Sequence, residues 1–430
     1  KRIHTCIGFA WFERLKKNKE KNDFKFEVPE GRKQILTICK NCDSVTYEHV
    51  DICDHCESID PDDLTKFTAW RPQYYVTDFT NEGEGKPYDG HVRRVPQTIH
   101  QHIEVDNKES SINVEQFNVT GLTGKIVNIN SNNLKGYEVY KDNKNGMIVN
   151  NVDYQSDPPS VATASLIDDD IVIMAEKYTD ILEVSHQDLP SYLRSESLDK
   201  DNKLALNVAW QSLAEILKKS IILIEDIEPN ELSINVRRDN NIWKMFLSDN
   251  LDNGAGYVTK YSHEKYFNKL IRYANQNVIK DFLTNTEHEE DCSSSCYKCL
   301  RSYENRRNHS KLDWRLGIDL FDIFMGNHHD EIKFGDHWHR LLKGPCFTQI
   351  KNLLPNDEAN NLVYKHDNNI HFYVTNEIIF LPCHPLSPLQ YENNINKLKR
   401  KYGAKRDFNF NPFTLLRSPV YEIMKFKNNS

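Results

Sequence analysis

The sequence has no stretch of about 18 consecutive apolar residues, so we expect no membrane-spanning helix and no membrane partner. No secretory leader opens the chain, which favours a cytoplasmic location. The chain is not basic either. Its 63 Asp and Glu residues outnumber 55 Lys and Arg residues, giving a net charge of −8. That balance excludes nucleic-acid binding through overall charge, so any such contact must come from a local basic patch.

Motifs of common nucleotide-binding and hydrolytic enzymes are also missing. The nearest approach to a phosphate-binding loop is GLTGKI at Gly121, which is too short and has no Ser or Thr after Lys125. No GxSxG or HExxH motif occurs. The glycine pair of NGAGY at Asn253 fits a ligand-binding loop or a turn between a strand and a helix. We expect this loop to lead into a helix that reaches about Leu283. We therefore expect a chain without an ATP site of its own.

Cysteine is scarce, with 10 in 430 residues, but most of the cysteines fall into two short clusters. Short paired spacings in a chain of this kind favour zinc over disulfides, and a tetrahedral zinc ion needs four converging donors. The first cluster, CKNC…CDHC, supplies four and predicts a zinc ribbon. Its cysteines are Cys39, Cys42, Cys53 and Cys56, and those of the second cluster, CSSSCYKC, are Cys292, Cys296 and Cys299.

The second cluster needs a fourth ligand, and two histidines are candidates. His288 precedes Cys292, and His309 follows Cys299 in a loop-like stretch. We favour His309, because a neutral imidazole in a loop can reach a zinc ion held by the three thiolates. A catalytic cysteine is the alternative, and it would need a base and an electropositive setting. Three clustered thiols with a histidine fit a closed structural zinc site better.

Hydrophobic patterning predicts an α+β protein with several domains. Residues 204–220 have helical apolar spacing, and Lys218 and Lys219 fall in the expected last turn. Residues 165–186, which include the acidic LIDDDIV, read as two strands joined by a polar turn. We expect four parts: an N-terminal segment with the zinc ribbon (1–90), a small antiparallel β region (91–156), a mixed α/β zinc-binding domain (157–326) and a C-terminal α/β tail (327–430).

Four stretches in one order carry a resemblance: EKYTDILEV, AWQSLAEIL, LSDNLDNGAGYV and CSSSCYKCLRSYENRRNHSKLDWRLGIDL. Together they resemble the zinc-binding domain family named after the bacterial repair helicase MrfA, over about residues 172–321. That family occurs at the C-terminal side of superfamily-two DNA helicases, including the large helicase of Druantia systems. It also occurs in stand-alone helicase partners such as DrmB, the accessory subunit of the DISARM anti-phage system. The resemblance implies zinc on Cys292, Cys296 and Cys299, and no ATPase residues.

Two classes of function follow. The first is a non-catalytic region that binds DNA and docks a superfamily-two helicase motor in bacterial anti-phage defence, with the C-terminal part of a DNA-repair helicase as a variant. Arginines bind phosphates and aromatic rings stack on bases, so we expect DNA contacts from the second cluster's surroundings, namely Arg301, Arg306, Arg307, Lys311 and Arg315, interleaved with Tyr297, Tyr303 and Trp314. The alternative is that Arg301 and Arg315 pair with Glu304 and Asp313, and that Trp314 packs in the core.

The second class is an enzyme, such as a nuclease, with its active site in the C-terminal tail. The residues that would bear the chemistry there are His337, His366, His371 and Asp367. They form no ordered Asp…Glu-x-Lys pattern, which argues against this alternative.

Overall fold

The structure is a computed structural model, and its described part forms an α+β fold, as the sequence predicts. A 10-stranded sheet, a four-stranded sheet and a two-stranded pairing are present in that part. No helix within it is long and apolar enough to cross a membrane. The described residues are 6–10, 33–77, 99–142, 146–150, 164–194, 198–239 and 242–428, except 41, 43, 54, 57, 72–73, 252, 329, 368–369 and 388–391.

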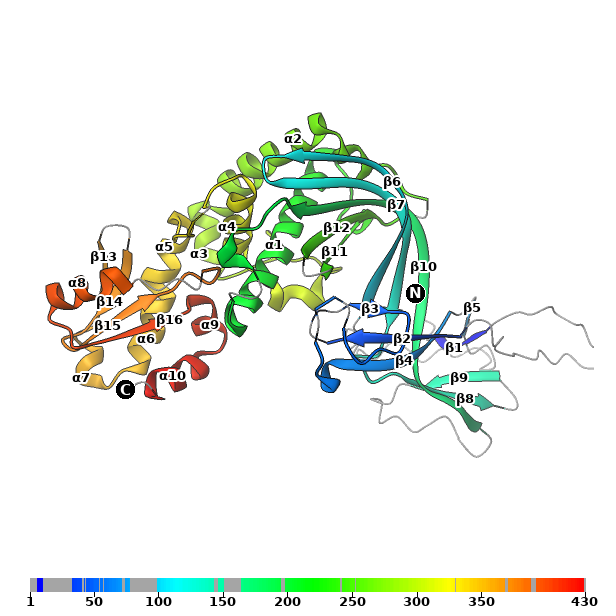
Figure 1. Ribbon diagram of the computed structural model, residues 1–430, viewed down its shortest axis with the longest axis horizontal. Helices are drawn as coiled ribbons and strands as arrows, with labels where there is room; N and C mark the ends of the chain where they lie inside the picture. The colour runs from blue at the N-terminus through cyan, green and yellow to red at the C-terminus, as the bar shows by residue number, and fades with distance from the viewer. Residues whose placement is uncertain are drawn as a thin grey trace, which may run out of the picture.

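Strand β10 (Ala164–His186) organises the large sheet. One edge pairs antiparallel with β8 (Tyr137–Asp142) and then with β7 (Phe117–Asn130). The other edge pairs parallel with β4 (Leu64–Trp70) and antiparallel with β12 (Ile242–Asp249). Figure 1 shows β10 as a long curved strand that runs from the β8–β9 end of the molecule to the helices around α1.

The remaining strands extend this sheet in both directions. The zinc-ribbon strands join through β4, and β6 pairs with β7 along its length. One sheet therefore contains strands from three of the four expected domains, whose division stays a prediction because residues 90–91 and 156–157 lie outside the described residues. The strands that extend the sheet are β2 (Lys33–Cys39), β3 (Val45–Thr46), β6 (Ile99–Val114), β9 (Gly146–Asn150) and β11 (Leu232–Asp239), whereas β1 (Cys6–Ala10) and β5 (Tyr74–Thr77) form the separate two-stranded pairing.

The expected turn in LIDDDIV is a bulge within β10. The pairing with β8 slips between Asp168 and Ile171, and Asp170 has a φ of 50°. A bulge inserts residues into one strand without ending it, which lets acidic residues sit mid-strand. The prediction of two strands over this stretch was therefore wrong, because the apolar alternation on both sides belongs to one continuous strand.

GLTGKI lies in the middle of β7 and forms no phosphate-binding loop. A Cβ atom on Gly124 would come within 2.2 Å of the Glu104 carbonyl oxygen, beside a register shift in the partner strand β6. A Cβ on Gly121 would come within 2.7 Å of the Ser262 hydroxyl. At both positions a neighbouring atom lies so close to the backbone that no room is left for a side chain, which explains the glycines.

Helix α1 (Lys200–Glu225) covers one face of the large sheet and is longer than predicted. Apolar side chains at Ile221 and Ile222 continue the buried stripe, and the helix ends at Asp226, which has a left-handed φ of 54°. Lys218 and Lys219 are therefore not in the last turn as expected. They lie more than a turn before the end of α1.

Helix α4 (Trp314–Phe324) packs against α1 and closes the main core. The crossing point is Gly317, where a Cβ would come within 2.9 Å of both Ser212 and Ile216 side chains. Trp210 of α1 and Phe324 of α4 meet edge to face over Phe117 of β7. A glycine at the contact lets the two helix backbones approach closely and buries large aromatic rings on either side.

A second group of helices leads to the cysteine-rich loop. Helix α2 (Glu264–Tyr273) continues without a break into a π-helical segment, η8 (Ala274–Leu283). The sequence predicted a helix reaching Leu283, and this is confirmed. Helix α3 (Thr286–Asp291) follows, capped by the Asn285 side chain, which accepts from the Glu287 amide. The second cluster therefore begins directly at a helix C-terminus.

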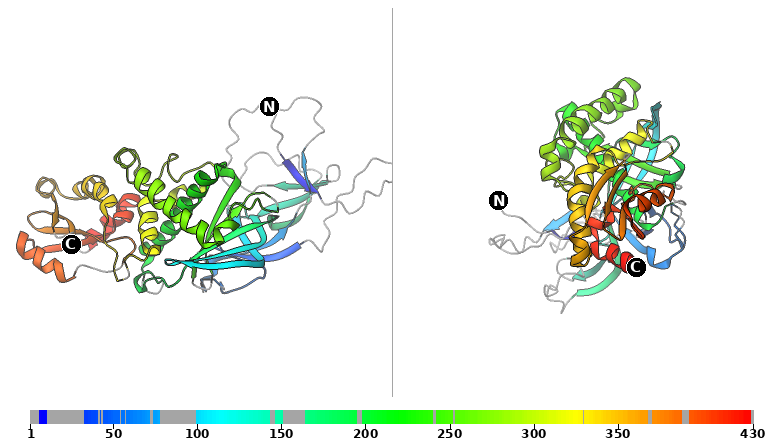
Figure 2. Two further views of the ribbon diagram at one scale, coloured as in Figure 1. Left: turned by 90° about the horizontal axis from the view of Figure 1, so that it is seen from above. Right: turned by 90° about the vertical axis from the view of Figure 1, so that its left-hand side faces the viewer.

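The C-terminal unit contains the four-stranded sheet. Strands β13 (Val363–Asp367), β14 (Ile370–Val374) and β15 (Ile378–Pro382) are antiparallel, and α8 (Glu392–Tyr402) crosses to β16 (Arg406–Phe410), parallel to β15. Strands β14 and β15 carry no carboxylate or lysine, so they offer no nuclease centre of the Asp…Glu-x-Lys kind. The side chain of Asp367 lies outside the described residues. In both Figure 1 and Figure 2 this unit lies at the end of the molecule opposite β8 and β9.

Short helices lie between α4 and this sheet in the chain and also follow the sheet. They are α5 (Asp336–Leu341), η10 (Leu342–Cys346), α6 (Phe347–Leu353), α7 (Asn356–Ala359), α9 (Pro412–Arg417) and α10 (Pro419–Asn428). Asp319 of α4 is 2% exposed and accepts hydrogen bonds from His337 (2.8 Å), Trp338 (2.9 Å) and His384 (3.1 Å). Burial raises the pKa of Asp319, but the charges of His337 and His384 and their hydrogen bonds outweigh it, so the pKa lies well below its usual value. His337 is thus a structural partner of Asp319.

Candidate metal centres

The first cluster converges at the end of β2, as the spacing predicts. Cys39 Sγ lies 3.6 Å from Cys56 Sγ, and Cys42 Sγ lies 3.6 Å from Cys53 Sγ. All four sulfur atoms lie within 4.8 Å of one another. Four sulfurs about 2.3 Å from a tetrahedral zinc ion are about 3.8 Å apart, whereas a disulfide needs about 2.05 Å. The cluster is therefore placed to bind zinc.

Two backbone turns of the same kind shape this first cluster. The Cys39 amide donates to the Ser44 carbonyl at 3.0 Å, and the Cys53 amide donates to the Ser58 carbonyl at 3.0 Å. Each turn brings the two cysteines of one Cys-x-x-Cys pair to the same side. Hydrogen bonds among these thiols lower the pKa of Cys56 and raise that of Cys42, because a proton shared between crowded sulfurs leaves one of them as the thiolate.

The second cluster is also complete, and its fourth member is His288. Sulfur–sulfur distances are 3.8 Å from Cys292 to Cys299 and 3.5 Å from Cys296 to Cys299. His288 Nε2 lies 3.7 Å from Cys296 Sγ, and the four donor atoms all fall within 4.8 Å of one another. Three cysteines and one histidine form a common tetrahedral zinc donor set. Two zinc sites are thus present, as predicted.

The preference for His309 was wrong. His309 Nε2 is 2.9 Å from the Ser302 carbonyl and 3.0 Å from the Asn305 side-chain oxygen, away from the sulfurs. His288 instead directs Nδ1 at the Leu283 carbonyl, 2.9 Å away, which leaves Nε2 for the metal. The sequence did contain a signal for His288. It precedes Cys292 by one helical turn, so α3 directs both side chains to the same side.

The thiols of the second cluster are placed in unlike surroundings. A hydrogen bond from Cys292 lowers the pKa of Cys299 to about 4, despite the opposing effect of burial.

Lys219 of α1 donates to the Cys299 carbonyl at 3.0 Å and to that of Lys298. Burial lowers the pKa of Lys219, and the charges of Cys299 and Cys296 oppose that shift. The cluster is therefore tied to α1 by a half-buried cation as well as by packing.

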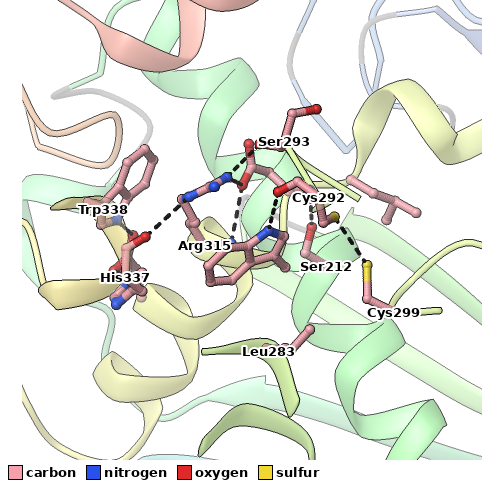
Figure 3. Close-up of polar contacts among 12 residues, drawn as sticks. Ser212, Leu283, Cys292, Ser293, Cys299, Arg315, His337 and Trp338 are labelled. Carbon is pink, nitrogen blue, oxygen red and sulfur yellow. Dashed lines mark hydrogen bonds and ion pairs between the residues drawn. The ribbon is translucent and has the colours of Figure 1, made fainter. Parts of the chain in front are cut away.

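Arg315 was predicted to contact DNA, and that prediction is wrong. The side chain is 2% exposed and donates to the Ser293 carbonyl at 2.6 Å and the His337 carbonyl at 3.2 Å (Figure 3). It also lies 3.8 Å from the carboxylate of Asp313, which Arg417 approaches at 3.3 Å. Next to it, Trp314 is fully buried and donates to the Cys292 carbonyl at 3.4 Å. Arg315 therefore pairs with Asp313 and Trp314 packs in the core, as the alternative prediction had it.

The loop after Cys296 has aromatic and cationic side chains at the surface. Tyr297, between two zinc ligands, is 69% exposed, and Tyr303 is 62% exposed. The guanidinium of Arg306 lies 4.7 Å from the Tyr303 ring centre. Arg301 is anchored by a 2.9 Å hydrogen bond from Nε to the Ser295 hydroxyl, and Lys311 is half-buried. The side chain of Arg307 lies outside the described residues. We call Tyr297, Arg301, Tyr303 and Arg306 the zinc-loop surface.

The NGAGY loop is a turn rather than a ligand site. Gly254 and Gly256 have φ angles of 73° and 74°. Backbone amides of this loop donate to two aspartate side chains of the protein. Asp249 accepts from the Ala255 amide at 2.7 Å and the Tyr257 amide at 3.1 Å, while Asp180 accepts from the Gly256 amide at 3.1 Å. Protein carboxylates therefore take the positions that a phosphate would need. These two acidic residues were not identified from the sequence.

Comparisons with known proteins find a distant likeness among solved structures. No protein-family model matches the chain, and no curated protein sequence matches it. Among solved structures, one described as DUF1998 helicase MrfA bound to DNA matches with a TM-score of 0.32 and 11% sequence identity. The match covers 53% of this chain and 25% of that chain, so this protein spans a small part of the helicase's length. A TM-score this low carries no argument about function.

Proposed function

We propose that this chain is a non-catalytic, zinc-stabilised DNA-binding region that works with a superfamily-two helicase motor. The observation that carries the proposal is the zinc-loop surface, where Tyr297 and Tyr303 are exposed, the Arg306 guanidinium lies 4.7 Å from the Tyr303 ring centre, and Ser295 orients Arg301. Aromatic rings stack on unpaired bases and guanidinium groups bind phosphates. The resemblance seen in the sequence supports the same role and a setting in bacterial anti-phage defence, with the motor in the same polypeptide or on a separate subunit.

Rigidity favours this surface as a binding site. Three zinc ligands, Cys292, Cys296 and Cys299, interrupt the loop, and the Cys296 amide donates to Cys299 Sγ at 3.0 Å. Lys219 of α1 also holds the loop, through its hydrogen bond to the Cys299 carbonyl. A loop that is already ordered loses little conformational entropy on binding, so its few contacts yield more affinity.

Salt-dependent DNA binding tests the proposal. Fluorescence anisotropy with labelled single- and double-stranded DNA, from low to moderate salt, gives the number of phosphates neutralised. The Arg306→Ala, Arg307→Ala double variant is expected to flatten the slope of log affinity against log salt by about 0.7 to 0.9 for each phosphate that is no longer neutralised. Tyr297→Ala is expected to weaken single-strand binding by about 1 to 3 kcal/mol and duplex binding less.

A matched control is the Lys265→Ala, Arg272→Ala double variant, which removes two exposed cations from α2. It should leave the slope unchanged, and zinc content and melting temperature should match wild type in all variants. An arginine variant that melts earlier but keeps its DNA affinity would assign those arginines to structure. An unchanged slope would place the DNA contact elsewhere, and the exposed cations Lys397, Arg400 and Lys405 of α8 and its following turn are the next candidates.

A further inference from the structure

His309 is not a zinc ligand, but it contacts the zinc-loop surface. Its ring centroid lies 5.4 Å from that of Tyr297, and the two ring planes meet at 86°, which is an edge-to-face arrangement. Aromatic rings attract one another in this geometry, because the positive edge of one ring meets the negative face of the other. Tyr297 itself is 69% exposed and lies between two zinc ligands. His309 therefore restricts the orientation of a ring that is otherwise open to solvent.

Two acceptors hold the His309 ring in turn. Its Nε2 lies 2.9 Å from the Ser302 carbonyl oxygen and 3.0 Å from Oδ1 of Asn305. Neither oxygen can donate, so Nε2 carries a proton and donates to both. The ring is thus fixed at one edge to the turn that carries Tyr303, while it also touches Tyr297. One histidine connects both exposed tyrosines of the zinc-loop surface.

Asn305 connects this turn to the core of the protein. Its side-chain amide donates to the Leu300 carbonyl at 2.7 Å and to Oε1 of Glu215 on α1 at 2.7 Å. Its Oδ1 also accepts from the Ser302 amide at 2.8 Å. Asn305 is 8% exposed and Glu215 is 5% exposed, so water cannot readily replace these hydrogen bonds. Both ends of the Asn305 amide are occupied, which fixes its orientation and that of the acceptor it offers to His309.

A continuous series of contacts therefore runs from α1 to the surface, through Glu215, Asn305 and His309 to Tyr297. The zinc ligands on either side of Tyr297 restrain its backbone but leave its side-chain torsions free. The contact with His309 restrains those torsions. A side chain that is already held in its binding orientation loses less conformational entropy when a ligand arrives, so it contributes more to affinity.

An exposed ring held in one orientation suits an unpaired base. Every base has a flat face, so stacking on an aromatic ring needs no particular sequence. A base inside a duplex is already stacked on its neighbours, and a protein ring reaches it only after that stacking is broken. Tyr297 lies on a short loop between zinc ligands, which leaves it little freedom to insert into a duplex. Single-stranded DNA is therefore the form that this ring is placed to bind.

We propose that His309 is a positioning residue, which holds the Tyr297 ring in place to stack on an unpaired base of single-stranded DNA. This inference rests on the proposed DNA-binding function. It makes one specific demand, namely that His309 acts on DNA through Tyr297. Once the Tyr297 ring is removed, the loss of His309 should have no further effect on affinity.

A double-mutant cycle with a labelled oligothymidine strand tests the proposal. His309→Ala is expected to weaken binding by about two- to tenfold, because Tyr297 must then be ordered on binding. The same substitution in the Tyr297→Ala background should leave affinity unchanged, since residues that act as one unit are not additive. Additive losses in the double variant would show that His309 acts on DNA by another route, and would overturn the proposal.

His309→Gln separates the positioning role from a structural one. Its side-chain amide can donate to the same two oxygens, but it has no ring to contact Tyr297. It should therefore melt like wild type and bind oligothymidine as weakly as His309→Ala does. Wild-type affinity of His309→Gln would mean that the loop hydrogen bonds matter and the ring contact does not. His263→Ala, at an exposed histidine before α2, is the matched control and should bind as wild type.

The single variants distinguish failure of this inference from failure of the proposed function. If Tyr297→Ala binds oligothymidine as tightly as wild type, the zinc-loop surface does not stack on bases and both ideas fail. If Tyr297→Ala weakens binding and His309→Ala does not, the DNA contact stands and the positioning role of His309 is refuted. Zinc content should be two ions per chain in every variant, which excludes metal loss as the cause of any difference.

Discussion

At the scale of single residues, the second zinc site depends on where one imidazole directs its two nitrogens. His288 donates to the Leu283 carbonyl through Nδ1 and turns Nε2 toward Cys296, whereas His309 is held by Ser302 and Asn305. Both histidines were chemically suitable, since each offers a neutral nitrogen donor. The difference comes from the helical turn that links His288 to Cys292, and from a carbonyl placed to orient the ring.

Replacing each histidine in turn separates the two roles. His288→Ala should reduce the zinc content from two ions per chain toward one and weaken zinc binding by at least about tenfold, because it removes a ligand. His309→Ala should retain both ions and lose only contacts within the loop. Elemental analysis after dialysis against a mild chelator measures the difference. If His309→Ala lost the ion and His288→Ala kept it, the assignment of the fourth ligand would be reversed.

The buried carboxylate of Asp319 gives a second prediction for a single residue. Asp319→Asn should lower the free energy of unfolding by about 3 kcal/mol at pH 7, because two imidazoles and an indole lose an ionised acceptor. The native pKa is depressed, so this stabilisation is present above the pKa of the unfolded carboxyl, about 3.9. It is lost as pH falls below that value toward the native pKa.

Urea unfolding of wild type and Asp319→Asn at pH 7, 5 and 3.5 provides the test. The difference between the two proteins should be smaller at pH 3.5 than at pH 5, because the unfolded carboxyl takes up a proton in that range. Comparing the proteins at the same pH cancels the effect of acid on the zinc sites. A difference that grew from pH 5 to pH 3.5 would show that the pKa of Asp319 is raised in the native protein.

At the scale of elements, the α1–α4 crossing connects the sheet to the second zinc site. α4 follows the 3-10 helix Arg306–Lys311 that comes after the second cysteine cluster, and the Asp313 amide at its start donates to the Ser212 hydroxyl of α1 at 2.8 Å. Gly317 lies one turn further along, where the two backbones are closest. Zinc binding, the helix crossing and the core therefore support one another within a few residues.

Gly317→Ala tests how tightly these helices pack. The added methyl group would overlap Ser212 and Ile216, so we expect a loss of about 1 to 3 kcal/mol in stability, although alanine favours helix. Gly344→Ala is the control, because no atom lies within 4 Å of its Cβ position. Chemical denaturation of both variants gives the comparison. Equal stability of Gly317→Ala and wild type would mean that α1 and α4 can separate at low cost.

At the scale of the whole molecule, the two zinc sites stabilise different parts of the fold. The first lies at the end of β2, which joins β10 through β4, and the second lies beside α1 and α4, which cover the sheet. Metal binding at each site is coupled to the folding of its own surroundings. Loss of one ion should therefore affect one part of the chain more than the other.

Metal content and stability together check this arrangement. Purified protein should contain two zinc ions per chain, and Cys296→Ser should contain one and unfold at lower temperature. Cys42→Ser should also contain one ion, but hydrogen exchange should rise near β2 and β3 rather than near α3. One ion or none in wild-type protein would contradict the two-site arrangement, as would identical exchange patterns in the two variants.

Local sequence pattern determined much of this protein. Cys-x-x-Cys spacing fixed the first zinc site, because its ligands lie in two short turns that form on their own backbone hydrogen bonds. Apolar periodicity predicted most of α1, because burial of one helical face recurs at 3.6 residues. The α+β class followed from the same patterns, since a run of strands precedes most of the helices along the described chain.

Tertiary structure decided what depended on contacts between distant residues. Whether Arg315 meets solvent or a core carboxylate, and which histidine completes the second site, is set by the docking of α4 and α3. The single long β10 appears only when β4, β7, β8 and β12 pair with it, since strand pairing outweighs local turn preference. The Asp319 network likewise forms only once the C-terminal unit folds, because its partners His337 and His384 are distant from Asp319 in the sequence.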